Sequence, residues 1–329
     1  MSGTELKVAI IGGGIIAGNH LAAIRATDGL RACAIAEIDA DKGDALARRH
    51  DIAAYRDYRL MIEQERPEVA VIALPHHLHR DAAVFAASQG CHLMLEKPMA
   101  ISVAECDDIA RAAEASGIRV LVGHTQQYIA DNLYARELIR GGQLGRAVMI
   151  HDIRHTDYFS PSRPGWFLEK SKSGGGILAN LGAHSIDKIQ WLTDGLVRKV
   201  DASTSHFGSR GDVEGSGIVY MELDNGIPAT IVQSGYPGAP RNETEIICTG
   251  GMIKLLAGEG VWVSRGGAYE RMDVPRTTTP FELQYADLLG AIRSGRQTGC
   301  PPEYGRGIIA ALEAVYLSAA SGKEQYVVR

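Results

Sequence analysis

The stretch LKVAIIGGGIIA, residues 6–17, decides the fold of this chain. A β-branched apolar run breaks at three glycines and helical spacing follows, which predicts a strand, a tight turn and a helix. In a dinucleotide-binding turn, Gly12 permits the tight bend, Gly14 lets the backbone approach a pyrophosphate, and Ala17 is the third small position. The pyrophosphate would rest on the first N–H groups of the helix. The contacts expected in this turn are Gly12, Gly14, Ile15 and Ile16.

An acidic residue follows the next predicted strand, residues 32–36. Glu37 stands 23 positions after Gly14, about the separation at which a carboxylate hydrogen-bonds a ribose 2′-hydroxyl. Ile38 follows, where an arginine would have accommodated a 2′-phosphate, so the pattern favours NAD over NADP. Two alternatives remain: Glu37 simply ends a strand, or Asp39 takes over its role.

The rest of the first half alternates between helices and strands. The spacing predicts helices over residues 39–50, 57–64, 78–89 and 103–116, and strands over residues 69–74, 93–95 and 120–122. A run of βα units predicts a doubly wound parallel sheet.

The sequence LPHHLH, residues 74–79, places three imidazoles within four residues. No carboxylate or cysteine completes a ligand set at a recognisable spacing, so no metal site is expected. A strand-to-helix loop over the cofactor is favoured instead, with Leu74, Pro75 and His79 beside the cofactor.

The sequence CHLMLEKPMA, residues 91–100, ends a buried strand in an acid, a lysine and a proline. Lys97 therefore leaves the carboxyl end of a parallel strand, where open α/β sheets place their ligands. Pro98 restricts the backbone and so aims the lysine. An ammonium near a desolvated cleft shifts its pKa readily and can take part in proton transfer. The plain alternative is a solvated lysine at a strand end.

After Gly123 the pattern changes. A helix is expected over residues 130–140 and a strand over residues 147–154, and GGGILANLGAHSID, residues 174–187, has helical spacing after its glycines. Asn180 and His184 are four apart and so share a helical face. An amide and an imidazole there suit the holding of a hydroxyl and the transfer of its proton. Alternatively, His184 only hydrogen-bonds a neighbour.

The remaining sequence is strand-like and then helical. Strands are expected over residues 199–207, 217–223, 228–235 and 243–249, and helices over residues 280–294 and 307–320. Short turns such as Asp224-Asn225-Gly226 predict antiparallel pairing. The expected class is α/β, with two domains. Residues 1–123 would be a dinucleotide-binding domain with a doubly wound parallel sheet. Residues 124–329 would be an α+β substrate-binding and oligomerisation domain with a large, open, mostly antiparallel sheet.

Composition excludes several classes of protein. The 329 residues are 45% apolar and 22% charged, and their formal net charge of −5 offers no basic field for nucleic acid. No apolar run approaches the ~20 residues that span a bilayer, and no secretory signal is visible. Five scattered cysteines without a Cys-x-x-Cys pair suit reduced thiols, so a cytoplasmic protein is expected.

Four motifs, in this order, resemble the Gfo/Idh/MocA family of pyridine-nucleotide oxidoreductases, which includes glucose–fructose oxidoreductase and inositol dehydrogenase. They are the glycine turn with His20 beyond it, Leu74-Pro75 with His79, Glu96-Lys97-Pro98, and residues 174–176 leading to Gly182, His184 and Asp187. The resemblance implies a Rossmann domain followed by an α/β domain whose open sheet often forms the subunit interface. It also implies reversible oxidation of a sugar or cyclic polyol hydroxyl.

The resemblance also implies roles for individual residues. Lys97 matches the family lysine that contacts the reacting hydroxyl and often the cofactor, and His184 matches the family's general acid/base. Asn180 stands where many relatives have aspartate, and Gln127 falls where relatives often have arginine, so the substrate stays open. The expected cofactor contacts in this half of the motif set are Leu74, Pro75, His79, Glu96 and Lys97. The expected substrate contacts are Gln127, Tyr128, His155, Trp166 and Asn180.

The expected function is NAD-dependent transfer of hydride between a sugar or polyol hydroxyl and nicotinamide. The alternatives are a hydrolase or lyase that oxidises a sugar transiently, and a non-catalytic NAD-binding protein. The expected partners are a small sugar or polyol and a second copy of the chain. Residues 217–221 are apolar on both strand faces, and an uncovered apolar face predicts a homodimer or homotetramer through the second sheet.

Overall fold

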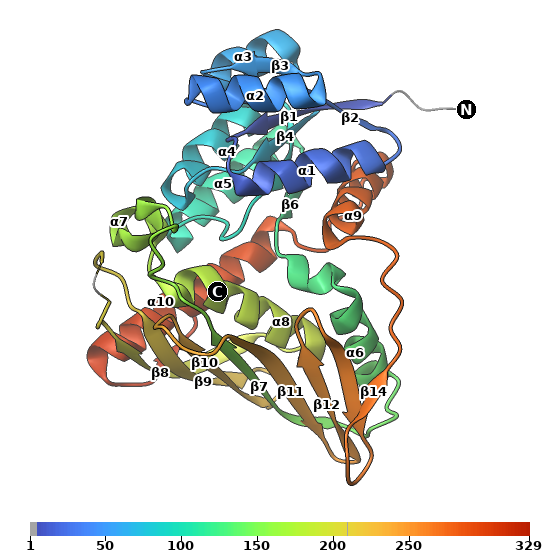
Figure 1. The fold of residues 1–329 in the computed structure, drawn as a ribbon, viewed down its shortest axis with the longest axis vertical. Coiled ribbons are helices and arrows are strands. Elements are labelled where there is room, and N and C mark those ends of the chain that lie inside the picture. The colour runs from blue at the N-terminus through green and yellow to red at the C-terminus, as the bar shows by residue number, and fades with distance from the viewer. Residues whose placement is uncertain (1–4, 209) are drawn as a thin grey trace. The chain divides into compact units, whose positions relative to one another are not determined.

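The computed structural model describes residues 5–208 and 210–329, which form two compact units (Figure 1). Residues 1–4, where no secretory signal is expected, and residue 209 lie outside the described residues. The first unit is the chain up to Thr125 together with Thr278–Arg306, and the second is Gln126–Thr277 together with Gly307–Arg329. The expected boundary after residue 123 is close to the first division, but the return of Thr278–Arg306 to the first unit was not expected.

The first unit is built on a six-stranded parallel sheet, counted over the described residues, in the order β3-β2-β1-β4-β5-β6. Its strands are β1(Leu6–Ile11), β2(Leu30–Ala36), β3(Ala53–Tyr55), β4(Val69–Ile72), β5(His92–Leu95) and β6(Val120–Val122). Its helices include α1(Ile15–Ala26), α2(Ala40–His50), α3(Tyr58–Glu65), α4(His79–Ser88), α5(Val103–Ser116) and α9(Pro280–Ser294). This order reverses between β1 and β4, the point at which doubly wound sheets bind dinucleotides. The predicted fold of this half is confirmed.

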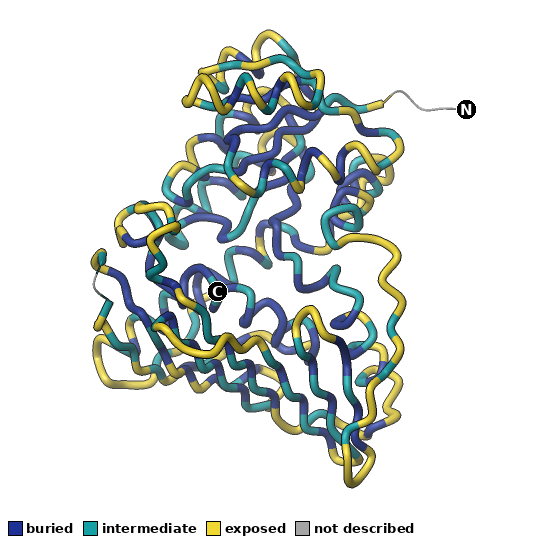
Figure 2. Tube along the Cα trace, viewed as in Figure 1, coloured by how far each residue is buried: buried dark blue, intermediate teal, exposed yellow. Residues whose placement is uncertain are grey.

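The central strands of this sheet form the core, as the dark blue runs in Figure 2 show. Residues 8–11 of β1 and all of β4 are at most 1% exposed. Such strands are covered on both faces, which is why they read as unbroken apolar runs.

The second unit contains a nine-stranded sheet, counted over the described residues, in the order β14-β13-β12-β11-β7-β10-β9-β8-β15. Its strands are β7(Ala147–His155), β8(Val197–Ser205), β9(Ser216–Leu223), β10(Pro228–Ser234), β11(Arg241–Cys248), β12(Gly251–Leu256), β13(Gly260–Ser264), β14(Glu270–Met272) and β15(Gln325–Tyr326). Adjacent strands pair antiparallel except β7 and β10, which are parallel. The expected large, mostly antiparallel sheet is confirmed.

Helices cover one face of the second sheet. The helical elements of this unit include α6(Ala130–Arg140), α7(Lys170–Ser173), the π-helical turn η4(Leu178–Gly182), α8(Ala183–Thr193) and α10(Pro302–Ser321), which begins in the first unit. α8 packs on β7, and β7 buries Ile150, Asp152 and Arg154 on that side. Apolar side chains such as Ile218 and Tyr220 stay exposed on β9. None of the described helices combines the length and apolarity that a membrane crossing requires.

Candidate functional site

The glycine turn after β1 has the geometry of a phosphate-binding turn. Gly12 has φ +100°, and a Cβ there would lie 2.4 Å from the carbonyl oxygen of Ala73, so only glycine fits. Gly14 is the N-cap of α1 and its helix start has no side-chain cap, and no described atom lies within 4 Å of a Cβ placed on Gly14. Ile15 is 95% exposed. The first N–H groups of α1 therefore remain available, as a pyrophosphate requires.

Glu37 is held beside this turn. Its Oε2 accepts hydrogen bonds from the backbone N–H of Gly13 at 2.8 Å and from Lys42 Nζ at 3.1 Å, and its Oε1 accepts from the N–H of Asp39 at 3.1 Å. Burial alone would raise the pKa of Glu37, but the backbone donors and Lys42 together lower it. Asp39 instead caps α2 by accepting from the Lys42 N–H. The ionised Glu37 carboxylate is thus the group suited to a ribose hydroxyl.

His79 joins the two loops that follow β4 and β5. Its Nε2 lies 2.9 Å from the carbonyl oxygen of Leu74, and its Nδ1 lies 3.0 Å from that of Pro98. The ring is fully buried, and burial lowers the pKa of His79 more than the carbonyls and Glu96 raise it. With both nitrogens engaged, His79 holds the loops in place and is not available as a metal ligand.

Glu96 belongs to a buried chain of polar groups. Its Oε1 lies 3.1 Å from His20 Nε2, and His20 Nδ1 lies 2.9 Å from the Tyr285 hydroxyl on α9. Its Oε2 accepts the N–H of Lys97 at 3.2 Å. Burial acts to raise the pKa of Glu96, but His20 and Lys97 lower it overall. The ionised Glu96 carboxylate therefore fixes the backbone at Lys97. Tyr285, the third member of this cluster, was missed by sequence reasoning.

Lys97 stands two residues after the end of β5 and is partly exposed. His124, which sequence reasoning also missed, lies close enough to Lys97 for the charge of the lysine to act on it. His124 is fully buried, and neither ring nitrogen has a hydrogen-bond partner among the described residues. Burial first, and the Lys97 charge second, lower the pKa of His124 to about 3. The His124 imidazole is thus neutral, so it adds no second positive charge beside Lys97.

In the second unit, Asn180 and His184 lie on either side of a change in helix geometry. Residues from Leu178 to Gly182 form the π-helical turn η4, and His184 is the second residue of α8. The expected helical spacing is confirmed, but the first turn is wider than the expected α-helix. π-Turns occur often at functional sites. Asn180 is buried and hydrogen-bonds Tyr158, and His184 is half-buried.

A buried carboxylate explains this turn. Glu214 Oε2 accepts from the N–H of Gly176 at 2.7 Å, and its Oε1 accepts from the N–H of Leu178 at 2.9 Å. A Cβ on Gly176 would lie 2.1 Å from the Glu214 carbonyl oxygen, so the glycines allow the close approach that the sequence suggested. Tyr316 donates to Glu214 at 2.9 Å. Glu214 sits 38 residues after Gly176, and no local signal marks it.

Of the other expected substrate contacts, one is tied to the helix of His184 and one lies on the opposite side of the sheet. Gln127 is buried and donates to Asp187 Oδ1 on α8 at 3.2 Å, which ties it to the helix of His184. Trp166 stacks on Phe167 with ring centroids 3.7 Å apart, and Tyr128 is half-buried. His155 ends β7, where strand alternation puts it on the face opposite Asp152 and away from α8. The structure therefore does not bring His155 to the helix that carries His184.

Two parts of the chain match known protein families. Residues 6–124 match the oxidoreductase family with an NAD-binding Rossmann fold, and residues 132–254 match the GFO/IDH/MocA C-terminal domain. The chain belongs to the Gfo/Idh/MocA family. The predicted resemblance is confirmed, and the first unit is an NAD-binding domain of a family of oxidoreductases.

Curated relatives and solved structures agree with this assignment. The chain is 30% identical over 195 residues to 1-carboxy-3-chloro-3,4-dihydroxycyclohexa-1,5-diene dehydrogenase of Comamonas testosteroni, covering 59% of this chain and 48% of the relative. It is 26% identical over 207 residues to 2,7-anhydro-N-acetylneuraminate hydratase of Mediterraneibacter gnavus, covering 63% and 54%. The chain thus spans about half the length of these two relatives. Levoglucosan dehydrogenase in complex with NADH has the same fold, with a TM-score of 0.91, 22% identity, and 99% and 100% coverage.

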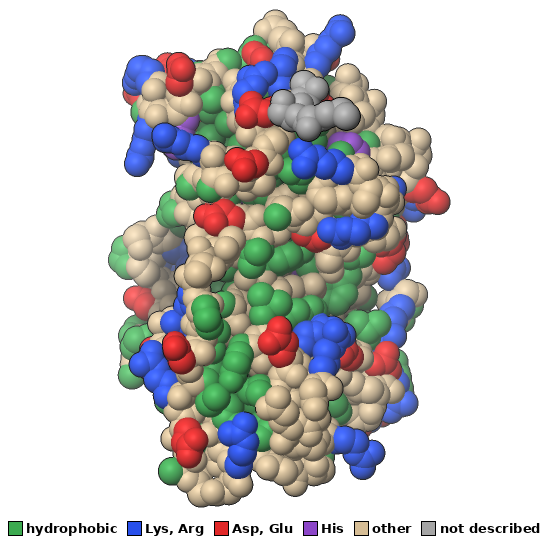
Figure 3. Space-filling view, turned by 90° about the vertical axis from the view of Figure 1, so that its right-hand side faces the viewer, with side chains coloured by type: hydrophobic (Ala, Val, Ile, Leu, Met, Phe, Trp, Pro, Cys, Tyr) green, Lys and Arg blue, Asp and Glu red, His purple; other side chains and the backbone are tan. Residues whose placement is uncertain are grey.

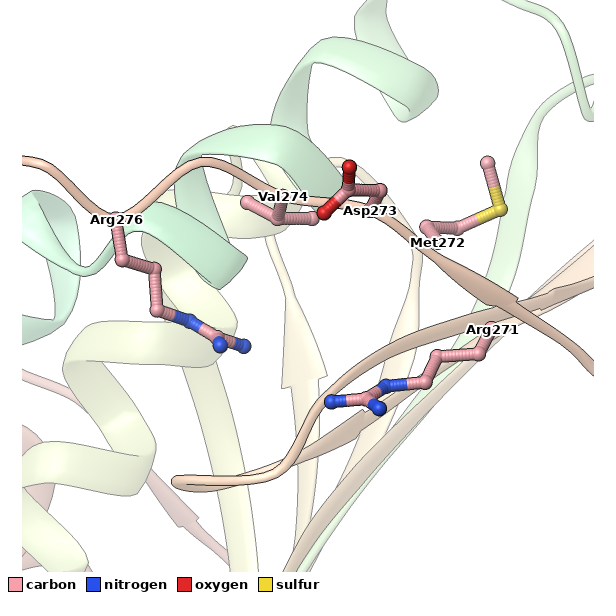
Figure 4. A pocket seen from close by; sticks show the side chains of 5 residues that line it. All are labelled: Arg271, Met272, Asp273, Val274 and Arg276. Atoms are coloured by element: carbon pink, nitrogen blue, oxygen red, sulfur yellow. The ribbon is translucent and has the colours of Figure 1, made fainter.

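A hollow elsewhere in this Gfo/Idh/MocA protein contains none of the expected site residues. It is lined by Arg271, Met272, Asp273, Val274 and Arg276 (Figure 4). Arg276 pairs with Asp131 at 2.8 Å, and Arg271 donates to the Glu259 carbonyl at 2.7 Å. Both guanidinium groups are thus engaged within the protein. Cations and anions are interspersed on the face drawn in Figure 3.

Proposed function

We propose that this protein is an NAD-dependent oxidoreductase that transfers hydride between a hydroxyl-bearing carbon of a sugar or cyclic polyol and nicotinamide. The observation that carries the proposal is Lys97 at the carboxyl end of β5, anchored by the buried Glu96 anion and next to a neutral His124. Two dehydrogenases among the similar proteins, one of a dihydroxycyclohexadiene and one of levoglucosan, support this class of substrate.

The cofactor has a fitting set of residues in the first unit. The backbone from Gly12 to Ile16 would hold the pyrophosphate, and Glu37 would accept hydrogen bonds from the ribose. Leu74 and Pro75, held by His79, would border the cofactor. When bound, NAD supplies the hydride acceptor, and the protein supplies binding, orientation and electrostatics.

The proton is the task of the chain's own residues. We assign Lys97 and His184 to the same hydroxyl on the pattern of the family. The Lys97 ammonium would lower the pKa of this hydroxyl and stabilise the charge of a developing alkoxide. His184 in its neutral form would accept the proton. Asn180 is an amide and cannot accept a proton, so its part is to orient a hydroxyl or to maintain the turn.

A hydratase or lyase reaction is the second candidate. One relative is a hydratase, and an enzyme that oxidises a sugar only transiently would leave NAD unchanged overall. Release of NADH in proportion to product separates the two, because only a net dehydrogenase makes it. A non-catalytic NAD-binding protein is disfavoured because Lys97 and His184 are both retained.

The test starts with sugars, cyclic polyols and sugar acids incubated with NAD and followed at the NADH absorbance. Lys97→Ala and His184→Ala are each expected to reduce turnover about 10²- to 10⁴-fold, the usual contribution of a positioned proton-transfer group. Both variants should still bind NADH, and their effects should be non-additive. His206→Ala, which removes an exposed imidazole of the second unit, is the matched control. Turnover of His184→Ala within a few-fold of wild type would show that the proton goes elsewhere.

We also propose that the chain assembles through the uncovered face of the second sheet. Met149 on β7 and Ile218 and Tyr220 on β9 are exposed apolar side chains. A contiguous apolar face is normally an association site, and most soluble homo-oligomers are symmetric. The expected product is a dimer or tetramer packed sheet to sheet.

A further inference from the structure

β7 places a buried ion pair under α8. Asp152 Oδ1 accepts from Lys188 Nζ at 2.9 Å and from Thr244 Oγ1 at 2.5 Å, and its Oδ2 accepts from Ser185 Oγ. Asp152 and Lys188 are both buried. The oxygens of Asp152 are therefore already engaged by three donors, and its charge is matched by Lys188.

Arg154 lies two residues further along the same buried face of β7. Its side chain is 8% exposed, and no hydrogen bond or ion pair among the described residues involves its guanidinium. Nε in particular is buried without a partner. Burial lowers the pKa of Arg154, with the charge of Asp152 acting against it, but arginine stays protonated in proteins. Asp152 acts on Arg154 through its charge but makes no hydrogen bond or ion-pair contact with it. The buried guanidinium therefore keeps open donors, and the site is suited to an anion from outside the chain.

Gln233 adds an acceptor next to this donor. It is the register partner of Arg154 on the neighbouring parallel strand β10, so the two side chains share a face. Gln233 is 1% exposed, its Nε2 donates to Ser185 Oγ at 3.0 Å, and its Oε1 has no partner among the described residues. The same Oε1 lies 3.8 Å from a Cβ built on Gly182. Gly182 and Ser185 flank Ala183-His184, so the unmatched acceptor of Gln233 lies beside the start of the helix that carries His184. Arg154 is the register partner of Gln233 on the same face.

We propose that Arg154 binds a carboxylate of the substrate and that Gln233 accepts a hydrogen bond from one of its hydroxyls. The substrate class is then a polyhydroxylated carboxylic acid, such as a sugar acid or a hydroxylated ring acid. This assignment rests on the proposed function, because it takes His184 as part of the substrate site.

The charges of the cluster favour a carboxylate over a phosphate. Arg154 and Lys188 are two cations beside one anion, Asp152, and Asp187 also acts on Lys188. Lys188 and Asp152 are in direct contact and cancel each other, which leaves the single charge of Arg154 for a singly charged carboxylate. The planar guanidinium fork matches a carboxylate with two parallel hydrogen bonds.

The experiment measures binding and turnover separately on the NADH-loaded or NAD-loaded full chain. The probes are matched acid and neutral compounds: D-glucuronate with D-glucose, D-galacturonate with D-galactose, and quinate with myo-inositol. Calorimetry gives Kd for the wild type, for Arg154→Gln and Arg154→Lys, and for the control Arg198→Gln, an exposed arginine paired with Glu222 on the second sheet.

The wild type is expected to bind at least one acid about tenfold or more tightly than its neutral partner. Arg154→Gln should lose about 10- to 100-fold of acid binding, the range of a charge-assisted hydrogen-bonded contact, and keep neutral binding within about twofold. Arg154→Lys keeps the charge and should lose less, and Arg198→Gln should lose nothing. Tryptophan fluorescence, which reports the second unit, checks that each variant is folded.

Two results would overturn the assignment: no acid bound better than its neutral partner, or a preference for acids that survives in Arg154→Gln. NADH formation distinguishes these failures from a failure of the proposed function. If NADH forms from neutral polyols and acids are not preferred, the dehydrogenase proposal stands and the carboxylate site is refuted. If acids bind through Arg154 but no NADH forms, the carboxylate site stands and the dehydrogenase proposal is refuted.

Discussion

Asp152 and Lys188 form a buried ion pair, and we expect the loss of Asp152 to lower the stability of the second unit more than the loss of Lys188. The two side chains are 0% and 5% exposed and their charged atoms lie 2.9 Å apart. Breaking a buried pair by removing one partner typically costs about 3–5 kcal/mol, because an uncompensated charge stays buried. The neighbouring Arg154 decides which partner is the more costly to lose.

Lys188→Met leaves Asp152 with Arg154 as a nearby counter-charge and with hydrogen bonds from Ser185 and Thr244. We expect a cost near the lower end, about 3 kcal/mol. Asp152→Asn leaves Lys188 and Arg154 as two buried cations without the anion between them. We expect a cost near the upper end, about 5 kcal/mol. The double substitution should cost less than the sum, since it removes the pair together.

The assay is urea unfolding followed by tryptophan fluorescence. Trp166, Trp191 and Trp262 are the three tryptophans of the chain, and all lie in the second unit, so the signal reports that unit. A loss of about 3 kcal/mol should lower the urea midpoint by about 1–2 M. Lys172→Met is the matched control, because Lys172 makes an exposed pair with Glu169 and such pairs contribute about 1 kcal/mol at most.

The pH dependence of stability gives a second reading of the same pair. Burial acts to raise the pKa of Asp152, but Lys188, Arg154 and its hydrogen bonds lower it from 3.8 to about 2. The unfolded chain binds this proton first, so about 2 kcal/mol of stability is present above pH 4 and is lost as the pH falls towards 2. Burial lowers the pKa of Lys188 in spite of Asp152, so the carboxylate is the partner that gains. A Lys188→Met cost equal to or above that of Asp152→Asn would refute this reasoning.

Three further predictions concern the cofactor, the turn and the assembly. Wild type should bind NADH about tenfold more tightly than NADPH in fluorescence titrations, because the Glu37 carboxylate repels a 2′-phosphate. Glu37→Gln should lose this preference, and the exposed-site control Glu63→Gln should keep it. Equal or tighter NADPH binding by wild type contradicts the assignment. Gly12→Ala would place a Cβ 2.4 Å from the Ala73 carbonyl oxygen, so it should abolish NADH binding in the same titration and cost about 1–3 kcal/mol of stability. The control Gly307→Ala, with open space around it, should do neither. Retained NADH binding in Gly12→Ala would argue against a role of the glycine turn in cofactor binding. Light scattering should show an oligomer that Ile218→Glu dissociates and Leu317→Glu, equally 60% exposed, does not; a wild-type monomer at micromolar concentration rules it out.

The first unit was readable from the sequence because its strands are buried on both faces. An apolar, β-branched run followed by glycine has few other structures open to it, and β1, α5 and β6 begin and end as expected. β3 has only the three residues Ala53–Tyr55, too few to show a period. The return of Thr278–Arg306 was not readable, because Tyr285 meets His20 across 265 positions and Thr298 meets Val120 across 178.

The second sheet was half predicted. Four of its later strands follow clear runs with turn signals between them, but β12, β13, β14 and β15 were missed. β12 and β13 are short and each begins at a glycine, and β14 and β15 have three and two residues. Such strands exist because a neighbour offers unpaired N–H and C=O groups. That condition belongs to the sheet and leaves little trace in the local sequence.

The site residues that were predicted are candidates for proton transfer, whereas the residues that were missed either position them or provide a further binding group. Lys97 and His184 stood out because the motifs around them, Glu96-Lys97-Pro98 and the helix after residues 174–176, resemble those of the family. Arg154 is an ordinary residue of strand-like sequence, and Glu214 stands in a glycine-rich segment between two expected strands. Only the fold shows that Glu214 caps a π-turn and that Arg154 is buried without a hydrogen bond to any described residue. The same distinction applies to His155, whose residue type suggested a ligand contact and whose strand register points it the other way.

The π-turn shows how these two kinds of residue depend on each other. Four residues complete slightly more than one turn of an α-helix, but a π-helical turn needs more, so Asn180 and His184 do not stack as a regular helix would stack them. Asn180 instead meets the buried Tyr158, whose hydroxyl donates to the Gly176 carbonyl at 3.2 Å. An amide serves this contact, whereas an aspartate in its place would bring a charge into a buried position. We therefore infer that asparagine at position 180 supports the turn, where an aspartate would serve a proton relay.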